Sequence, residues 1–182
     1  VGTTSHAGKS LITAAICRLL VRQGFNVTPF KGQNMALNAY ITADDQEMGH
    51  AQAVQAWAAK IEPRVEMNPI LLKPQGDMTS QVIMMGTAVG RVQAADYYRD
   101  YFDRGWAAIT SCLDQLGTEF DYIVCEGAGS PAEINLKHRD LTNMRVASYL
   151  QANTVLVADI DRGGVFAHIV GTLELLEPEE RA

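Results

Sequence analysis

The first residues of the chain have the types and spacing of a loop that binds nucleotide phosphates. The loop runs from Gly2 to Ser10 and ends in Gly8-Lys9-Ser10, directly before an apolar sequence with helical spacing. Backbone N–H groups of such a loop and the helix N-terminus behind it bind anionic oxygens, the lysine reaches the terminal phosphates, and the Ser10 hydroxyl can bind Mg²⁺. A glycine turn that only caps a helix is the alternative, and it would need neither side chain. The predicted nucleotide-binding residues are Thr3, Thr4, Ser5, His6, Ala7, Gly8, Lys9 and Ser10.

The loop departs by one residue from the pattern Gly-x-x-x-x-Gly-Lys-Ser. That pattern requires glycine at position 3, where this chain has Thr3, and the nearest glycine is Gly2. The MinD/ParA ATPases place a signature lysine five residues before the loop lysine, where this chain has Thr4. This difference disfavours a nucleotide-switched binding protein but leaves that class open. The chain also has no Asn-Lys-x-Asp motif for reading guanine, and its arginines are too dispersed for the lid of a nucleotide kinase.

Two side chains at the ends of predicted strands could complete a phosphate-transfer site. Glu126 follows an apolar strand predicted at residues 122–125, where nucleotide enzymes commonly place a carboxylate that holds Mg²⁺ directly or through water. Lys31 follows a strand predicted at residues 26–30 and could neutralise charge on a transferred phosphoryl group. Each residue also has a simpler interpretation, as a solvated side chain at a strand end.

Charged residues in two further places are candidates for metal or substrate binding. Glu47 lies at the start of a helix predicted at residues 47–60, where it could supply a second carboxylate for Mg²⁺ or simply stabilise the helix N-terminus. Asp161 and Arg162 follow a buried strand predicted at residues 154–158. They could contact substrate or nucleotide, or cap the last helix.

Apolar runs that alternate between strand and helix must position these residues. Strands are expected at residues 26–30, 81–85, 122–125 and 154–158, a polar loop at 32–46, and helices at 10–23, 47–60, 94–116, 141–150 and after Gly164 through 176. This order predicts an α/β fold with a mostly parallel sheet and helices on both faces. Loops at the carboxyl ends of parallel strands meet in one crevice, so Lys31, Glu126 and Asp161 are expected near the phosphate loop.

Length and composition exclude several classes of function. A chain of 182 residues is long enough for one sizeable domain, and its net charge of −6 gives no general attraction to nucleic acid or an anionic membrane. No apolar run reaches the roughly 18 residues of a membrane span. Cys17, Cys112 and Cys125 are scattered in apolar runs, which predicts reduced thiols and a cytoplasmic protein. Both ends look cut, so we expect a fragment that lacks its first strand and a further domain.

The ordered motifs of the chain resemble those of the dethiobiotin synthetase-like amide ligases. The shared features are Gly-Thr-x-x-x-x-Gly-Lys-Ser at the start, a strand-end lysine, and Glu-Gly-Ala-Gly beginning at Glu126. Within that group the chain is similar to the cobyric acid synthase family of cobalamin biosynthesis. The segments that carry this similarity are residues 30–35, 47–52, 68–74, 126–136 and 159–167. His6 and Gly32 depart from the acidic residue and the alanine expected in relatives, which leaves detailed loop contacts open.

The resemblance implies a P-loop NTPase-like fold and an ATP-dependent ligase. Its substrate would be adenosylcobyrinic acid a,c-diamide, whose peripheral carboxylates b, d, e and g are phosphorylated by ATP and then amidated by ammonia. The residues implied by motif match are Lys9 and Lys31 for phosphate contact, Glu126 for catalysis, Ser10, Glu47 and Glu126 for Mg²⁺, and Gln33, Asn34, Lys73, Asp161 and Arg162 for substrate. A related ligase acting on another acid is the alternative.

The resemblance also implies a partner for the chain. The family carries a C-terminal glutamine amidotransferase domain that releases ammonia from glutamine, and we expect residues 1–182 to be the synthetase domain without it. None of the three cysteines is expected to be the glutaminase nucleophile, so this chain alone should not use glutamine. A homodimer is left open.

Overall fold

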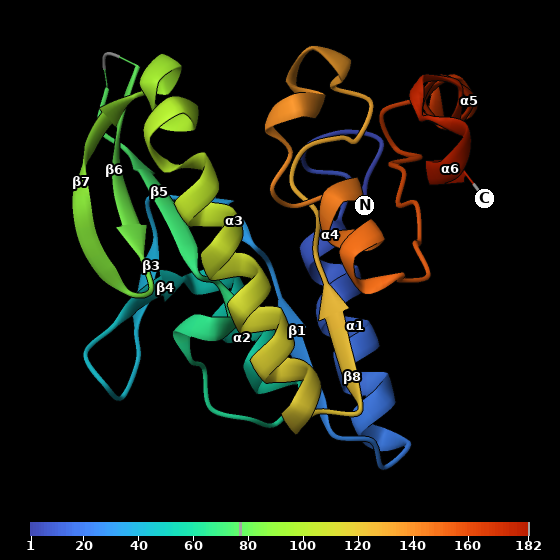
Figure 1. Cartoon of the computed structure of the whole chain (residues 1–182). Coiled ribbons are helices and arrows are strands. Elements are labelled where there is room, and N and C mark those ends of the chain that lie inside the picture. The colour runs from blue at the N-terminus through green and yellow to red at the C-terminus, as the bar shows by residue number, and fades with distance from the viewer. Residues whose placement is uncertain (77, 182) are drawn as a thin grey trace.

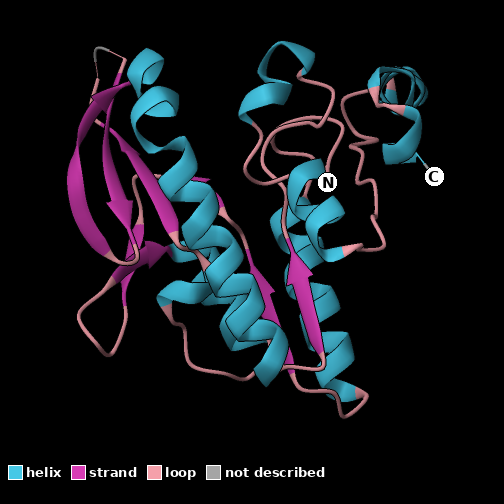
Figure 2. Cartoon of the chain, viewed as in Figure 1, coloured by secondary structure: helices cyan, strands magenta, loops and turns pink. Residues whose placement is uncertain are grey.

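The computed structural model describes residues 1–76 and 78–181, in which helices separate runs of strands and further helices follow the last strand (Figures 1 and 2). The helices are α1 (Lys9–Arg22), α2 (His50–Ala58), α3 (Ala94–Glu119), α4 (Met144–Leu150), α5 (Val165–Leu175) and α6 (Pro178–Arg181), with short 3-10 turns η1 (Val65–Met67) and η2 (Ile134–Arg139). The strands are β1 (Val27–Phe30), β2 (Gln33–Met35), β3 (Ala39–Ile41), β4 (Glu47–Gly49), β5 (Ile70–Pro74), β6 (Thr79–Met84), β7 (Thr87–Gln93) and β8 (Tyr122–Cys125). This is an α/β fold.

The parallel pair β1–β8 lies between two layers of helices. Val27 packs against α1 and α2 with Cys17 and Ala59, whereas Phe30 points to the other face and packs against α3. Alternate residues of a strand point to opposite faces, and strands covered on both faces are apolar throughout. All four residues of β1 are buried, as this arrangement requires.

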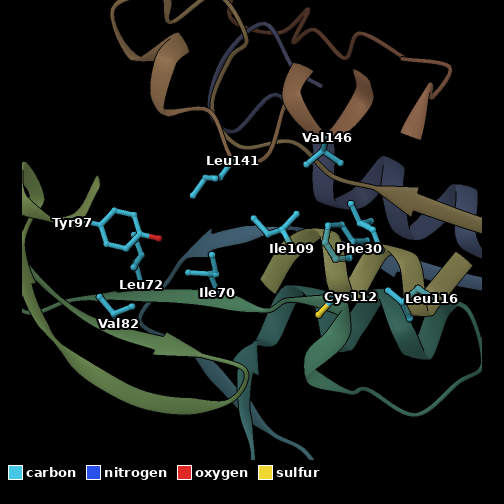
Figure 3. Close-up of a cluster of buried hydrophobic side chains, with 11 residues drawn as sticks. Phe30, Ile70, Leu72, Val82, Tyr97, Ile109, Cys112, Leu116, Leu141 and Val146 are labelled. Carbon is cyan, nitrogen blue, oxygen red and sulfur yellow. The ribbon is translucent and has the colours of Figure 1, made fainter. Parts of the chain in front are cut away.

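A mixed sheet of four strands, in the order β2-β5-β6-β7, extends the same core. Strands β2 and β5 are parallel, while β5, β6 and β7 run antiparallel to their neighbours. The long α3 runs along both sheets and contributes Ile109 to the cluster of buried side chains that Figure 3 shows together with Ile70 and Val82. The antiparallel pair β3–β4 lies beside this sheet.

Most of the predicted elements that position the site are confirmed. The structure has the helices expected at residues 10–23 and 94–116, and the strands at 26–30 and 122–125, to within a few residues at each end. The final helix is also present as α5. The strand at 122–125 was expected to be buried, but Tyr122 is exposed and the following three residues are half-buried.

Several other predictions were wrong. The polar loop expected at residues 32–46 contains β2 and β3, and the helix expected from Glu47 begins at His50, because Glu47 pairs with Ile41 in the β3–β4 ladder. Strand β7 was not predicted, and the helix expected at 141–150 is the shorter α4.

Residues 154–158 do not form the buried strand that their apolar sequence predicted. An isolated parallel bridge joins Gly2 to Val157, and residues 154 and 155 are exposed. A ladder needs a partner strand of comparable length, and here the backbone bonds are with the short segment Val1 to Thr3. No helix within residues 1–76 and 78–181 combines the length and the apolar character that crossing a bilayer requires.

Candidate nucleotide site

The phosphate loop leads into α1 through a glycine that adopts a left-handed conformation. Gly8 has φ of 95° and lies at the N-cap, so its backbone turns directly into the first helical residue, Lys9. Glycine adopts this conformation without steric cost. Helices leave their first N–H groups without intrahelical partners, and here the exposed Ser10 stands in that first turn. The loop therefore provides the anion-binding end of a helix.

The Lys9 side chain folds back over the loop. Its Nζ donates hydrogen bonds to the carbonyl oxygens of Thr4 and Gly129, each at 2.8 Å. A Cβ at position 2 would lie 2.9 Å from both Cδ and Nζ of Lys9. Gly2 is thus the residue that makes room for the lysine, while Thr3 is buried and donates its N–H to Val157. The glycine at position 2, one residue before the position that the motif requires, is therefore the one that lies against the lysine.

Lys31 and Glu126 meet at the carboxyl ends of neighbouring parallel strands. Phe30 and Cys125 are in register, so the residues after them lie side by side. Lys31 Nζ donates to Glu126 Oε1 at 2.9 Å, and Ser10 Oγ donates to the same oxygen at 2.8 Å. The structure therefore brings together three of the predicted residues, and Lys9 lies close enough for its charge to interact with both Lys31 and Glu126.

The surroundings of Glu126 favour the ionised form of its carboxyl group. Burial raises the pKa of the Glu126 carboxyl, but the charge of Lys31 and hydrogen bonds from Lys31, Gln55 and Ser10 outweigh burial, so the pKa lies below its usual value. The pKa of Lys9 is lowered first by burial and then by the positive charge of Lys31, against the attraction of Glu126. Two cationic side chains and one carboxylate thus surround the end of the loop.

Glu126 has two further partners that the sequence did not identify. Gln55 Nε2 donates to Glu126 Oε2 at 2.6 Å, and Gln52 Nε2 approaches the same oxygen at 3.4 Å. Both glutamines come from α2 and are almost completely buried. Their spacing of three residues in an alanine-rich helix places them on one face, which is the signal that could have indicated them.

The residues around Ser10 fit a magnesium ion. The Ser10 hydroxyl and the Glu126 carboxylate are hydrogen-bonded to each other, and both could supply an oxygen ligand to a metal ion. In phosphate-transfer sites, Mg²⁺ is usually held by one or two such protein groups together with water and phosphate oxygens. No group of three or more His, Cys, Asp or Glu side chains that could hold a metal occurs in the part of the chain that the structure describes. Ser10 and Glu126 would be the protein donors to the ion.

Glu47 lies in β4 rather than at a helix start, and it forms a separate ion pair with Lys73 of β5. Both side chains are half-buried. These are two predicted residues, one for metal and one for substrate, that contact each other.

The other predicted substrate residues divide into two places. Gln33 accepts a hydrogen bond from the Tyr97 hydroxyl at 2.7 Å, and the buried Asn34 donates to Gln52 at 3.0 Å. Asp161 and Arg162 are exposed, and Arg162 pairs with Asp159 in its own loop at 3.1 Å. Asn34 is therefore linked to Glu126 through Gln52, Gln33 is held by Tyr97, and the last two residues are held by local contacts.

A cavity of about 420 Å³ is lined mainly by the segment that follows Glu126. Its walls include Gly129, which holds Lys9, and the charged residues Lys137, Arg139 and Asp140. Asp140 accepts the backbone N–H groups of Thr142 and Asn143, directly before α4, and Asn143 donates to the Ala128 carbonyl at 2.8 Å. The segment after Glu126 therefore forms one wall of the cavity, and this wall carries both positive and negative side chains.

Comparison with known proteins identifies what this chain resembles. Residues 1–181 match the family model described as the CobQ/CobB/MinD/ParA nucleotide binding domain. The chain is 80% identical over 182 residues to the cobyric acid synthase of Acaryochloris marina, 76% over 182 residues to that of Rippkaea orientalis, and 77% over 181 residues to that of Trichormus variabilis. Each match covers the whole of this chain and 37% of the relative, so the chain spans 37% of the length of these curated relatives. The matches confirm the resemblance that the motifs indicated and the P-loop type of α/β fold.

Proposed function

This chain belongs to the family of CobQ/CobB/MinD/ParA nucleotide binding domains, and on that premise we propose that it is the ATP-binding part of a cobyric acid synthase. The observation that carries the proposal is the contact of Ser10 and Lys31 with one oxygen of Glu126, directly beside Lys9. In the proposed reaction, ATP phosphorylates carboxylates b, d, e and g of adenosylcobyrinic acid a,c-diamide, and ammonia then displaces the phosphate. The product is an amide at each position.

The arrangement suits this chemistry because a carboxylate is a poor acyl donor until one of its oxygens becomes a good leaving group. Transfer of a phosphoryl group depends on positioning and on fixed positive charge near the transferred group. Lys9 and Lys31 supply that charge from two different elements. Mg²⁺, held by Ser10 and Glu126, would neutralise the phosphates, and Glu47 is the further carboxylate proposed for the ion.

The acid is proposed to approach through the cavity beside Gly129. A volume of about 420 Å³ is in the usual range for a small ligand, whereas a corrinoid with all its side arms is larger. We therefore expect one carboxylate arm to enter at a time. Arg139 and Gln33 line the wall, together with Lys137, whose ammonium is paired with Glu180. Lys73, Asp161 and Arg162 remain proposed substrate residues, whereas Asn34 is buried and bonded to Gln52.

Ammonia is proposed to come from a glutamine amidotransferase domain outside this chain. The thiols present here are unsuited to be the nucleophile, because burial raises the pKa of Cys17, Cys112 and Cys125 to about 12 in each case. A thiol reacts as its thiolate, which would be scarce at neutral pH. We expect the isolated chain to show no glutaminase activity.

The proposal is tested by assaying the full-length protein with the corrinoid diamide, ATP and glutamine, and following each amidation by mass spectrometry. We expect successive ATP-dependent mass changes, which Lys9→Ala should abolish. The substrate of dethiobiotin synthetase and cobyrinic acid serve as competing acids. ATP-dependent turnover with one of those acids and none with the corrinoid diamide would overturn the proposed substrate. Nucleotide-dependent partner binding without turnover on any acid would favour a nucleotide-switched binding protein instead.

A further inference from the structure

The two oxygens of the Glu126 carboxylate have different surroundings. Oε1 accepts from Ser10 and Lys31, on the side of the phosphate loop, while Oε2 accepts from Gln55 at 2.6 Å and Gln52 at 3.4 Å. An ionised carboxylate only accepts hydrogen bonds, so the NH₂ group of each glutamine must face it. The orientation of both amides is therefore determined by the charge of Glu126.

The Gln52 amide is itself held by a second amide. Its Oε1 accepts from Asn34 Nδ2 at 3.0 Å, and Asn34 Oδ1 accepts the backbone N–H of Met35 at 3.0 Å. Asn34 of β2 therefore donates to Gln52 of α2, which donates to Glu126 after β8, and Gln55 donates to Glu126 separately. Hydrogen bonds in such a row polarise one another where water is excluded. We call Asn34, Gln52 and Gln55 the amide row.

Packing at Gly49 leaves the amide row little freedom. A Cβ at this position would lie 2.5 Å from Gln52 Oε1 and 2.6 Å from Asn34 Nδ2. The Gly49 N–H donates to Asn68 Oδ1 at 2.9 Å, and Asn68 Nδ2 donates to the carbonyl of Lys31 at 2.9 Å. Exposed fractions of 0% for Gln52, 1% for Gln55 and 8% for Asn34 show that water does not compete for these bonds.

We propose that the amide row consists of positioning residues, which hold Oε2 of Glu126 so that Oε1 stays directed at the Ser10 hydroxyl. The inference rests on the proposed function in one respect, namely that Glu126 and Ser10 hold Mg²⁺ with ATP. None of the three amides touches Oε1. Asn34 and Gln52 act on the site through Glu126, whereas Gln55 Nε2 also donates to the Ser10 carbonyl oxygen at 3.4 Å. Partners of this kind commonly change metal affinity by about 10–100-fold when they are removed.

The test compares Gln55→Met with a matched control in the full-length protein. Methionine keeps the length of the side chain and removes the donor. Gln115→Met is the control, because Gln115 Nε2 also donates to a carboxylate, Glu119 Oε1 at 3.1 Å, but on the exposed surface of α3. Binding of ATP is measured by calorimetry over a series of Mg²⁺ concentrations, with the thermal unfolding midpoint of each variant recorded without nucleotide.

We expect Gln55→Met to raise the Mg²⁺ concentration for half-maximal ATP binding about tenfold, with ATP affinity at saturating Mg²⁺ changed less than about threefold. Gln52→Met removes the longer contact with Glu126 and should raise the same Mg²⁺ concentration by a smaller factor. This variant replaces Gln55→Met in the test if Gln55→Met does not fold. Gln115→Met should leave it unchanged.

A folded Gln55→Met or Gln52→Met variant with the Mg²⁺ dependence of the wild type would overturn the inference. Equal losses of ATP affinity at all Mg²⁺ concentrations would also overturn it, because that result indicates a general structural role. The proposed function fails separately, if the wild type binds Mg²⁺ and ATP but amidates no corrinoid.

Discussion

Two lysine–glutamate pairs in this molecule have the same chemistry and different surroundings. The Lys31 and Glu126 side chains are 10% and 2% exposed, and Glu126 also accepts from Ser10 and Gln55. The Lys73 and Glu47 side chains are 25% and 22% exposed. Both glutamates were predicted to hold Mg²⁺ from sequence. The structure places one in a buried hydrogen-bond network and the other in a half-solvated pair.

The difference indicates what each lysine can do. A buried charge must stay paired, because an unpaired ion in the interior carries a large desolvation cost. Lys31 is therefore a fixed counterion of Glu126. Water reaches both members of the second pair, so Lys73 can leave Glu47 at low cost. We infer that Lys73 and a metal ion would compete for Glu47.

The largest expected effect is on stability. Lys31→Met leaves the buried Glu126 carboxylate without its counterion and should lower the free energy of unfolding by about 3 kcal/mol. Lys73→Met should lower it by less than about 1 kcal/mol, since its partner stays solvated. Urea unfolding followed by tryptophan fluorescence measures both. Similar losses for the two variants would show that the burial difference does not govern the pairs.

The next effect concerns metal binding. Glu126→Gln removes the charge from the oxygen that contacts Ser10, and we expect the Mg²⁺ concentration for half-maximal turnover to rise about 100-fold or turnover to vanish. Glu47→Gln should raise it by about tenfold. The measurement is ATP-dependent amidation against Mg²⁺ concentration. A larger effect at Glu47 than at Glu126 would reverse the assignment of the principal carboxylate.

A smaller effect separates competition from a structural role for Lys73. If its ammonium competes with Mg²⁺ for Glu47, Lys73→Met should lower the Mg²⁺ concentration needed for ATP binding by about threefold, or about 0.7 kcal/mol. In the double variant Glu47→Gln with Lys73→Met, the Mg²⁺ concentration needed for ATP binding should no longer be lowered. An increased Mg²⁺ requirement in Lys73→Met would show that the lysine supports the site rather than competing at it.

The parts of the site that could be predicted from sequence are those set by local pattern. Gly8-Lys9-Ser10 before an apolar helix fixes the loop, and Lys31 and Glu126 follow apolar strands whose carboxyl ends meet in a parallel pair. These arguments need periodicity and the geometry of parallel strands, and nothing about distant packing.

The remaining features depend on contacts between distant segments. Gln52 and Gln55 look like a solvated face of an alanine-rich helix until α2 packs against Glu126, 71 positions from Gln55. Glu47 has the sequence context of a helix start, but pairing of β4 with β3 overrides it. Residues 154–158 are apolar enough for a strand, yet pairing depends on what lies beside them. The sequence pattern alone does not show which distant segment a helix or strand will pack against or pair with.

The smallest expected effect concerns Lys9, and it tests whether this lysine is held as firmly as Lys31 or is as free to move as Lys73. Lys9 is held by two carbonyl groups, and its side chain lies against Gly2, so its position depends on the absence of a Cβ there. Gly2→Ala should displace the Lys9 ammonium slightly and weaken ATP binding by about threefold, because small misplacements of a phosphate-contacting group reduce its effect.

Gly117→Ala is the matched control for Gly2→Ala. A Cβ at Gly117, inside α3, would meet no atom within 4 Å, so alanine there should stabilise the helix by about 0.5–1 kcal/mol and leave ATP binding unchanged. Wild-type ATP affinity in Gly2→Ala would mean that Lys9 adjusts as freely as Lys73 does. Lys9 would then resemble Lys73, which can leave its partner at low cost, rather than Lys31, which is fixed beside Glu126.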